Sequence, residues 1–244
     1  MKALIINADD FGLSRGVNLG IIEAFQRGVL TSTTIMTNML EMEHAVSLAR
    51  ENPALGVGVH LTLTAGRPLL SDLQTVADED GNFRKLSYYQ GFFDIDLDEV
   101  YKEWKAQIEK ALTCGLHPTH IDSHHHIHTY GNLSEVFVKL ATEYHLPCRK
   151  VNDDHPSLWK NVKSNDAFEL KVDRLKDLSS FLDLHQEASV IEVMCHPAYV
   201  DKRLLEKSSY HYPRVYELSL LTDPSLKTAF IQCSDIRLIS YASL

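Results

Sequence analysis

The sequence predicts an α/β protein folded as a single (β/α) barrel over residues 1–244, either TIM-like or an irregular variant of that barrel. Apolar, strand-like runs alternate with amphipathic segments nearly throughout the chain, which favours a parallel sheet with helices packed outside it. The number of such units, roughly six to eight, favours a closed or nearly closed barrel. No glycine-rich phosphate-binding fingerprint follows the first strand, which disfavours a Rossmann fold. A length of 244 residues with 44% apolar content suits one domain of barrel size.

The expected strands and helices follow from apolar runs and capping residues. Residues 3–8 form an apolar run typical of a buried parallel strand, and Ser14 is placed to cap the helix after it. The apolar face of that helix carries Val17, Ile21, Ile22 and Phe25. Further strands are expected at residues 31–36, 55–63, 120–123, 189–194 and 236–239, with a weaker candidate at 149–151. Further helices are expected at residues 43–51, 97–112, 133–144, 167–184 and 224–231, the last of them capped by Asp223.

A long segment without periodicity separates the third expected strand from the helix at 97–112. Residues 64–95 contain several glycines and a proline, and a loop of this length inside a compact domain is usually functional or disordered. Its aromatic side chains have two equally weighted interpretations, as platforms that stack on sugar rings or as a local core beneath a lid. These aromatic residues are Phe83, Tyr88, Tyr89, Phe92 and Phe93.

The net charge and the cysteine content indicate which kinds of partner the protein could bind and in which cellular compartment it is expected. The formal net charge is -9, which disfavours binding to nucleic acid or to an anionic membrane. No apolar run approaches the ~20 residues that span a bilayer. The four cysteines form no CxxC pair, so we interpret them as reduced, mostly buried side chains. Together with an N-terminus that does not resemble a signal peptide, these features predict a cytoplasmic protein.

Carboxylates and imidazoles follow several of the expected strands. In a parallel barrel the residues after each strand gather on one face, so these side chains are expected to share one rim. Carboxylate and imidazole together are the usual ligands of Zn²⁺, Fe²⁺ or Mn²⁺, and we therefore predict a metal site. Side chains alternate in an extended segment, so not all of residues 124–126 can point into one site. The rim residues are Asp9, Asp10, His60, His120, Asp122, His124, His125, His126, His128 and His196.

Each of these residues also has a purely structural interpretation. The pair Asp9 and Asp10 could serve as a helix cap with a solvated charge, and His60 alone could be a hydrogen-bonded core histidine. The histidine run is harder to explain in this way, because it lies between expected structured segments. It is the combination of the separate pieces that favours a metal.

Five stretches of the sequence resemble the YdjC-like carbohydrate deacetylase family, of the chitooligosaccharide deacetylase type. They run in order from the first expected strand to beyond His196, and so cover most of the chain. The stretches are NADDFGLS at 7–14, TSTT at 31–34, VHLT at 59–62, PTHIDSHHHIH at 118–128 and EVMCHPA at 192–198.

The resemblance implies a barrel related to the polysaccharide deacetylases and a divalent metal ion, Mg²⁺ by family habit, with Zn²⁺ as the alternative by ligand softness. It implies a homodimer that removes acetyl groups from N-acetylglucosamine units of short chitooligosaccharides during chitin degradation. Carried over by position, the metal ligands are Asp10, His60 and His124. The catalytic residues are then Asp9 as general base and His196 as general acid. His128 stays open as an alternative ligand, because His124 with His128 is closest to the spacing of the wider deacetylase group.

Three other functions remain open on the sequence. A metal-dependent sugar isomerase or epimerase could use a similar ligand set on the same barrel. A non-catalytic sugar-binding or metal-binding protein would keep the site without turnover. A metal hydrolase of another bond, such as a phosphoester, is disfavoured by the lack of a basic cluster among the expected rim residues.

Overall fold

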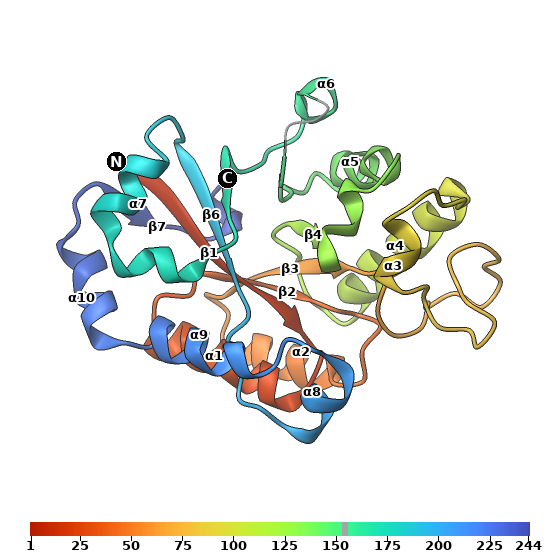
Figure 1. Cartoon of the computed structure of the whole chain (residues 1–244), viewed down its shortest axis with the longest axis horizontal. Helices are drawn as coiled ribbons and strands as arrows, with labels where there is room; N and C mark the ends of the chain where they lie inside the picture. Colours follow the sequence, from red (N-terminus) through yellow and green to blue (C-terminus); the bar gives the residue numbers. More distant parts are fainter. Residues whose placement is uncertain (153–155) are drawn as a thin grey trace.

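The computed structural model describes residues 1–152 and 156–244, and its centre is a parallel sheet (Figure 1). The sheet has seven strands in the order β4-β3-β2-β1-β6-β5, and β7 also pairs with β1. The pairings between these strands are parallel. The strands are β1 (Lys2–Phe11), β2 (Ser32–Ile35), β3 (Gly56–Leu61), β4 (Ile121–Ser123), β5 (Ala167–Glu169), β6 (Val190–Cys195) and β7 (Ile236–Leu238).

The sheet curls so that its two outer strands, β4 and β5, approach each other through intervening segments. Cys148 forms isolated parallel bridges to Ile121 in β4 and to Ser164, which precedes β5 by a few residues. The result is a curled parallel sheet that closes only irregularly. The predicted α/β fold is therefore confirmed, in the irregular form of the barrel.

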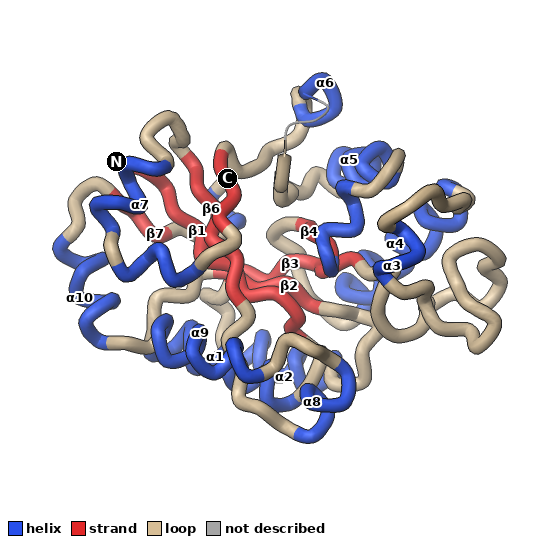
Figure 2. The backbone as a smooth tube through the Cα atoms, in the orientation of Figure 1, coloured by secondary structure: helices blue, strands red, loops and turns tan. Residues whose placement is uncertain are grey.

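Helices surround the strands (Figure 2). The predicted caps are present, because the side chain of Ser14 accepts a hydrogen bond from the Val17 amide and that of Asp223 accepts one from the Ser225 amide. In the part of the chain that the structure describes, no helix has the length and apolar character that a membrane span requires. The helices are α1 (Arg15–Arg27), α2 (Met42–Glu51), α3 (Leu86–Tyr89), α4 (Leu97–Thr113), α5 (Leu133–Glu143), α6 (Pro156–Trp159), α7 (Leu178–Leu184), α8 (Lys202–Lys207), α9 (Tyr212–Leu221) and α10 (Pro224–Gln232), with short 3₁₀ turns η1 (His124–Thr129), η2 (Val172–Lys176) and η3 (Tyr241–Ser243).

Two of the expected elements are wrong. The helix expected at 167–184 is in fact strand β5, the 3₁₀ turn η2 and the short helix α7, because residues 167–169 pair in register with residues 191–193 of β6. Tertiary strand pairing thus overrides a local helical pattern. The weak strand candidate at 149–151 is not a strand, and the bridge in this region is made by Cys148. Helices α8 and α9 were not expected, since their buried positions are few and give no clear apolar stripe.

The long loop at 64–95 is fastened to helix α4 by two glutamates one helical turn apart. The carboxylate of Glu103 accepts hydrogen bonds from the backbone amides of Leu69, at 3.0 Å, and Leu70, at 3.1 Å. The carboxylate of Glu99 accepts the amides at positions 74 and 75, each at 2.7 Å. These bonds hold the loop as a fixed wall beside the carboxyl ends of the strands.

The aromatic residues of this loop mostly form a local core. Phe83 is 3% exposed and Tyr89 is 1% exposed, whereas Phe92 is fully exposed. Tyr88, Tyr89 and Phe93 pack against one another, with ring centroids 5.2 to 6.3 Å apart. Of the two interpretations, the local core therefore applies to most of them, and Phe83 alone also borders the cavity described below.

We expect Glu103→Ala to loosen this wall and to destabilise the protein. The change leaves the part-buried amides of Leu69 and Leu70 without an acceptor, and loss of a buried acceptor typically costs about 1–3 kcal/mol. Urea unfolding should give a lower free energy of unfolding, and limited proteolysis should cut within residues 64–95 sooner. Glu51→Ala, at an exposed position of helix α2, is the control. Equal stability and equal cleavage in the two variants would contradict the anchoring role.

Candidate metal centre and active-site cavity

The carboxyl ends of β1, β3, β4 and β6 bring the predicted site residues to one rim. Asp9 and Asp10 lie near the end of β1, and His60 lies near the end of β3, where it is in register with Asp122 of β4. His124 follows β4 directly, and His196 follows β6. The expected gathering at one face is therefore present, although its members differ in what they contact.

Asp10, His60 and His124 form a compact set of ligand atoms within 4.8 Å of one another. Oδ1 of Asp10 lies 3.0 Å from Nδ1 of His124 and 3.5 Å from Nε2 of His60. Although these contacts are short, Oδ1 is buried and has no hydrogen bond of acceptable geometry among the described residues. A buried carboxylate oxygen that faces two imidazole nitrogens without a hydrogen bond is a donor set that fits a divalent cation.

Neighbouring groups orient these candidate ligands. Nδ1 of His60 lies 2.6 Å from Oδ1 of Asp122, whose other oxygen accepts a hydrogen bond from Thr34 at 2.9 Å. This carboxylate–imidazole pair leaves Nε2 of His60 directed at Asp10, as is usual for metal-binding histidines. Oδ2 of Asp10 accepts a hydrogen bond from Nη2 of Arg214 at 2.6 Å. Asp10 has φ of 71°, a left-handed backbone conformation that is unusual outside glycine.

The electrostatic field at His60 favours positive charge. Burial alone would lower the pKa of His60, but the negative charges of Asp122 and Asp9 and the hydrogen bond to Asp122 outweigh it and raise the pKa to about 10. The field that favours a proton on this imidazole favours a bound cation for the same reason.

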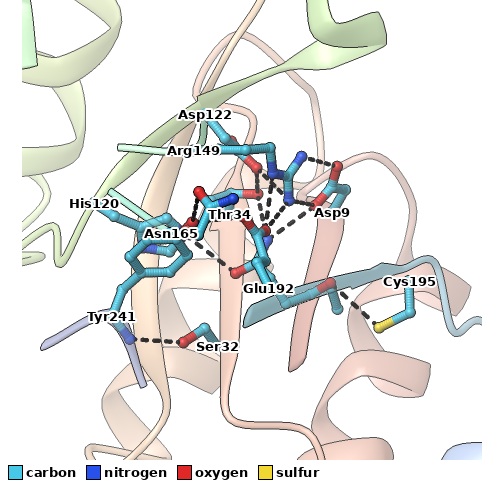
Figure 3. Close-up of polar contacts among 12 residues, drawn as sticks. Asp9, Ser32, Thr34, His120, Asp122, Arg149, Asn165, Glu192, Cys195 and Tyr241 are labelled. Carbon is cyan, nitrogen blue, oxygen red and sulfur yellow. Dashed lines mark hydrogen bonds and ion pairs between the residues drawn. The ribbon is translucent and has the colours of Figure 1, made fainter. Parts of the chain in front are cut away.

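Asp9 is held by a buried arginine (Figure 3). Nη1 and Nη2 of Arg149 donate to the two carboxylate oxygens of Asp9, each at 2.7 Å, and Nδ2 of Asn7 donates at 2.9 Å. Burial raises the pKa of Asp9, but the Arg149 guanidinium outweighs this effect and holds the pKa far below its usual range. Asp9 also forms a second ligand-like group with His60 and Asp122, but Arg149, Thr34 and His60 already contact those carboxylates.

Arg149 also contacts two further carboxylates, those of Glu192 and Asp122. Its Nε and Nη2 donate to Glu192 at 2.8 and 2.6 Å, and Nη2 lies 3.0 Å from Asp122. The hydroxyl of Tyr241 donates to the other oxygen of Glu192 at 2.5 Å, as Figure 3 shows. Arg149 and Glu192 have no exposed surface, so this is a fully buried ionic network.

His120 belongs to this network rather than to the metal centre. Its ring stacks on Tyr241 with centroids 3.9 Å apart, and Nε2 contacts Oδ1 of Asn7 at 3.1 Å. Burial holds its pKa well below the usual value, so the ring is neutral. Gly58 of strand β3 packs against His120, and a Cβ at this position would lie 2.5 Å from Nδ1 of His120, so a larger residue would clash with the ring.

The histidine run does not alternate as an extended segment would. His125 and His126 have φ of 56° and 52°, and with these left-handed residues His124, His125 and His126 all line the cavity. The assumption of an extended segment is therefore wrong, because the chain turns at η1, but only His124 of the three belongs to the ligand set around Asp10. Burial lowers the pKa of His125 and of His126 to about 3 in each case.

His128 lies in the hydrophobic core. It has no exposed surface, its Nδ1 contacts the hydroxyl of Ser123 at 2.6 Å, and its ring stacks on Phe137 with centroids 4.2 Å apart. The candidate set around Asp10 therefore contains His60 and His124 and does not contain His128.

A cavity of about 990 Å³ opens over the candidate metal centre. The loop at 64–95 forms one wall, and residues in and around α8 and α9 form another. His196 also borders it; burial and the neighbouring Arg214 lower the pKa of this imidazole. The lining includes the basic residues Arg67, Arg203, Lys207 and Arg214, none of which was among the rim residues expected from the sequence. The lining also includes Asp9, Asp10, His60, His124, Phe83, Tyr210 and Glu217.

Sequence reasoning missed most of the polar partners of the site. Arg149 lies in the segment that was only a weak strand candidate, and Arg214 lies on the unexpected helix α9. Glu192 gave one usable signal, because a charged residue inside an apolar strand is rarely buried without a partner. Its partner could not be named without the fold.

Comparisons with known proteins show what the whole chain is similar to. The YdjC-like protein family matches residues 3–232. A carbohydrate deacetylase of Clostridium beijerinckii is 43% identical over 249 residues, with 99% of each chain covered, and one of Geobacillus stearothermophilus is 44% identical, covering 97% of this chain and 96% of the relative. A solved structure from Enterococcus faecalis V583, named as a candidate cellobiose-phosphate cleavage protein, superposes with a TM-score of 0.92 at 36% identity, covering 99% of this chain and 98% of that one.

The predicted enzyme class, a hydrolase of amide bonds in carbohydrates, agrees with the names of the two deacetylase relatives. The family predicted from the sequence stretches is confirmed by a match over nearly the whole chain. The chain belongs to the YdjC-like protein family.

Proposed function

We propose that this protein is a metal-dependent carbohydrate deacetylase that removes acetyl groups from N-acetylglucosamine units of short chitooligosaccharides. The observation that carries the proposal is the set of Asp10, His60 and His124 at the floor of a large cavity. Membership of the YdjC-like family and the names of its relatives support the same reaction. A cytoplasmic location and a homodimer stay predictions.

Asp10, His60 and His124 would hold the cation, Mg²⁺ or Zn²⁺. A bound divalent ion would polarise the acetyl carbonyl and lower the pKa of a water molecule. The carboxylate and two imidazoles suit Zn²⁺ by softness, and the family habit favours Mg²⁺. Elemental analysis decides between them.

Asp9 would accept the proton of the attacking water on a carboxylate oxygen. Its pairing with Arg149 keeps it ionised, at the cost of low basicity, because its pKa lies far below the usual range. The proton would then have to pass on at once rather than rest on Asp9. His196, whose lowered pKa keeps it neutral at the start, would take up a proton during the reaction and donate it to the departing nitrogen.

The cavity suits a sugar of one to a few units. Its volume lies at the upper end of the range of about 300–1,000 Å³ that is common for small-molecule sites. The aromatic residues Phe83 and Tyr210 border the cavity, and Arg67, Arg203 and Lys207 add positive charge to its lining. These basic residues favour a second candidate substrate, the same sugar carrying a phosphate. The printed name of the enterococcal neighbour also refers to a sugar phosphate.

We expect the purified protein to release acetate from N,N'-diacetylchitobiose, to stop after chelation and to resume after addition of a divalent cation. The physical reason is that amide hydrolysis needs both a stronger nucleophile and a polarised carbonyl. The assay compares this sugar, its phosphorylated form, acetylated xylan and an acetylated peptide. Full activity without metal, or equal release from xylan or peptide, would contradict the proposal. Isomerised sugar without acetate would favour an isomerase or epimerase, and tight sugar or metal binding without turnover would favour a binding protein.

We expect Asp10→Asn and Asp9→Asn to leave different traces. Asp10→Asn exchanges an anionic ligand for a neutral one and should weaken metal affinity markedly. Asp9→Asn should keep the metal and lower kcat with little change in KM, the pattern of an interaction made mainly in the transition state. Metal content by elemental analysis and steady-state acetate release check both. Loss of metal in Asp9→Asn with retention in Asp10→Asn would reverse the two roles. Both side chains are buried and ion-paired, so thermal unfolding of each variant is measured as well.

His196→Ala should slow turnover far more than it weakens metal binding. A residue that donates a proton to the leaving group acts in the transition state, and such groups typically contribute about 10²–10⁴-fold. Steady-state kinetics and metal titration are compared with wild type. A metal-free His196→Ala protein would make His196 a ligand and refute its assignment as the general acid.

A further inference from the structure

Arg214 has a buried guanidinium group in which one nitrogen lacks a hydrogen-bond partner among the described residues. It lies on helix α9 and is 2% exposed. Its Nε donates to the backbone oxygen of Tyr210 at 2.6 Å, and its Nη2 donates to Oδ2 of Asp10 at 2.6 Å. Nη1 is buried and has no hydrogen-bond partner among the described residues. Arginine carries five N–H donors, and a buried donor without an acceptor is costly, so this nitrogen requires an explanation.

The position of Arg214 distinguishes it from the other basic residues that line the cavity. Arg67 and Lys207 are exposed and Arg203 is half-buried, whereas Arg214 is buried and bonded to Asp10. Nη1 belongs to the same planar group as Nη2, which bonds the carboxylate that faces His60 and His124. The acetamide of a substrate has to reach this floor for the proposed reaction to occur.

We propose that Arg214 is a catalytic residue of the proposed deacetylation, in which Nη1 donates a hydrogen bond to the acetyl oxygen of the substrate while Nη2 fixes Asp10. As water attacks the carbonyl carbon, the C=O π electrons move to that oxygen, and its negative charge meets a fixed positive group. A donor placed in advance at such an oxygen is typically worth about 10²–10³-fold in kcat. The inference rests on the proposed function and adds a residue outside the sequence stretches by which the family resemblance was assigned.

A purely structural role for Arg214 makes a different prediction. Holding Asp10 needs one donor, which a lysine ammonium can supply as a point charge. A second donor, directed at the substrate, needs the fork of the guanidinium. Replacement by lysine therefore separates the two roles.

The experiment compares Arg214→Lys, Arg214→Ala and the control Arg27→Lys, which changes an exposed arginine on helix α1. Mg²⁺ and Zn²⁺ are titrated calorimetrically into the metal-free proteins, and kcat and KM are measured at saturating metal. We expect Arg214→Lys to keep metal affinity within a few-fold of wild type and KM nearly unchanged, while kcat falls about 10²–10³-fold. Arg214→Ala should lose metal affinity as well, and added guanidinium ion should restore part of its kcat.

Three outcomes overturn the proposal. One is an Arg214→Lys protein with wild-type kcat, and another is a loss of kcat that excess metal fully recovers, since Arg214 would then act only through Asp10. The third is Arg214→Ala without rescue by guanidinium ion, which remains informative where the lysine variant is unstable. A wild-type protein that releases no acetate from any of the sugars refutes the proposed function itself, and the metal titrations still report whether Arg214 supports Asp10.

Discussion

The barrel is organised around one buried cation, Arg149, which contacts Asp9, Asp122 and Glu192. These carboxylates come from β1, β4 and β6, and Arg149 itself follows the bridge at Cys148 that links the outer strands. Removal of one partner of a buried ion pair typically costs about 3–5 kcal/mol, because a charge is left unpaired in a medium of low polarity. Through Asp122 the same arginine also steadies His60, so the candidate metal centre and the closure of the sheet depend on one side chain.

The two arginines leave the site negative. Among the described residues, the permanent cations that Asp9, Asp10 and Asp122 contact are Arg149 and Arg214, and Glu192 adds a group whose pKa burial raises. An excess of buried negative charge is costly without further compensation. The raised pKa of His60 is one result of this excess negative charge, because the charge favours a proton on the imidazole. A bound divalent cation would neutralise more of the charge than one proton does.

The sequence alone predicted the parts of the molecule that local pattern controls. Apolar runs gave most strands, and the rule that parallel strands end at one face brought Asp10, His60 and His124 together in advance. The sequence alone could not predict the roles of residues that depend on partners far away in the chain. Arg149 and Arg214 pair with carboxylates more than a hundred residues away, and β5 exists because of its pairing with β6. A glycine such as Gly58 generally weakens a strand, but here its missing side chain makes room for His120.

The position of Tyr241 has a consequence for how the protein is made. The candidate ligands lie at residues 10, 60 and 124, whereas the hydroxyl that bonds Glu192 and the ring that stacks on His120 belong to Tyr241. Strand β1, which precedes the other strands of the sheet in the sequence, pairs with β6 and β7, which follow all the others. Such contacts, distant in sequence, close slowly. A nascent chain therefore holds its candidate metal ligands well before Tyr241 is available to complete the neighbouring network, so we expect the site to be completed late in folding.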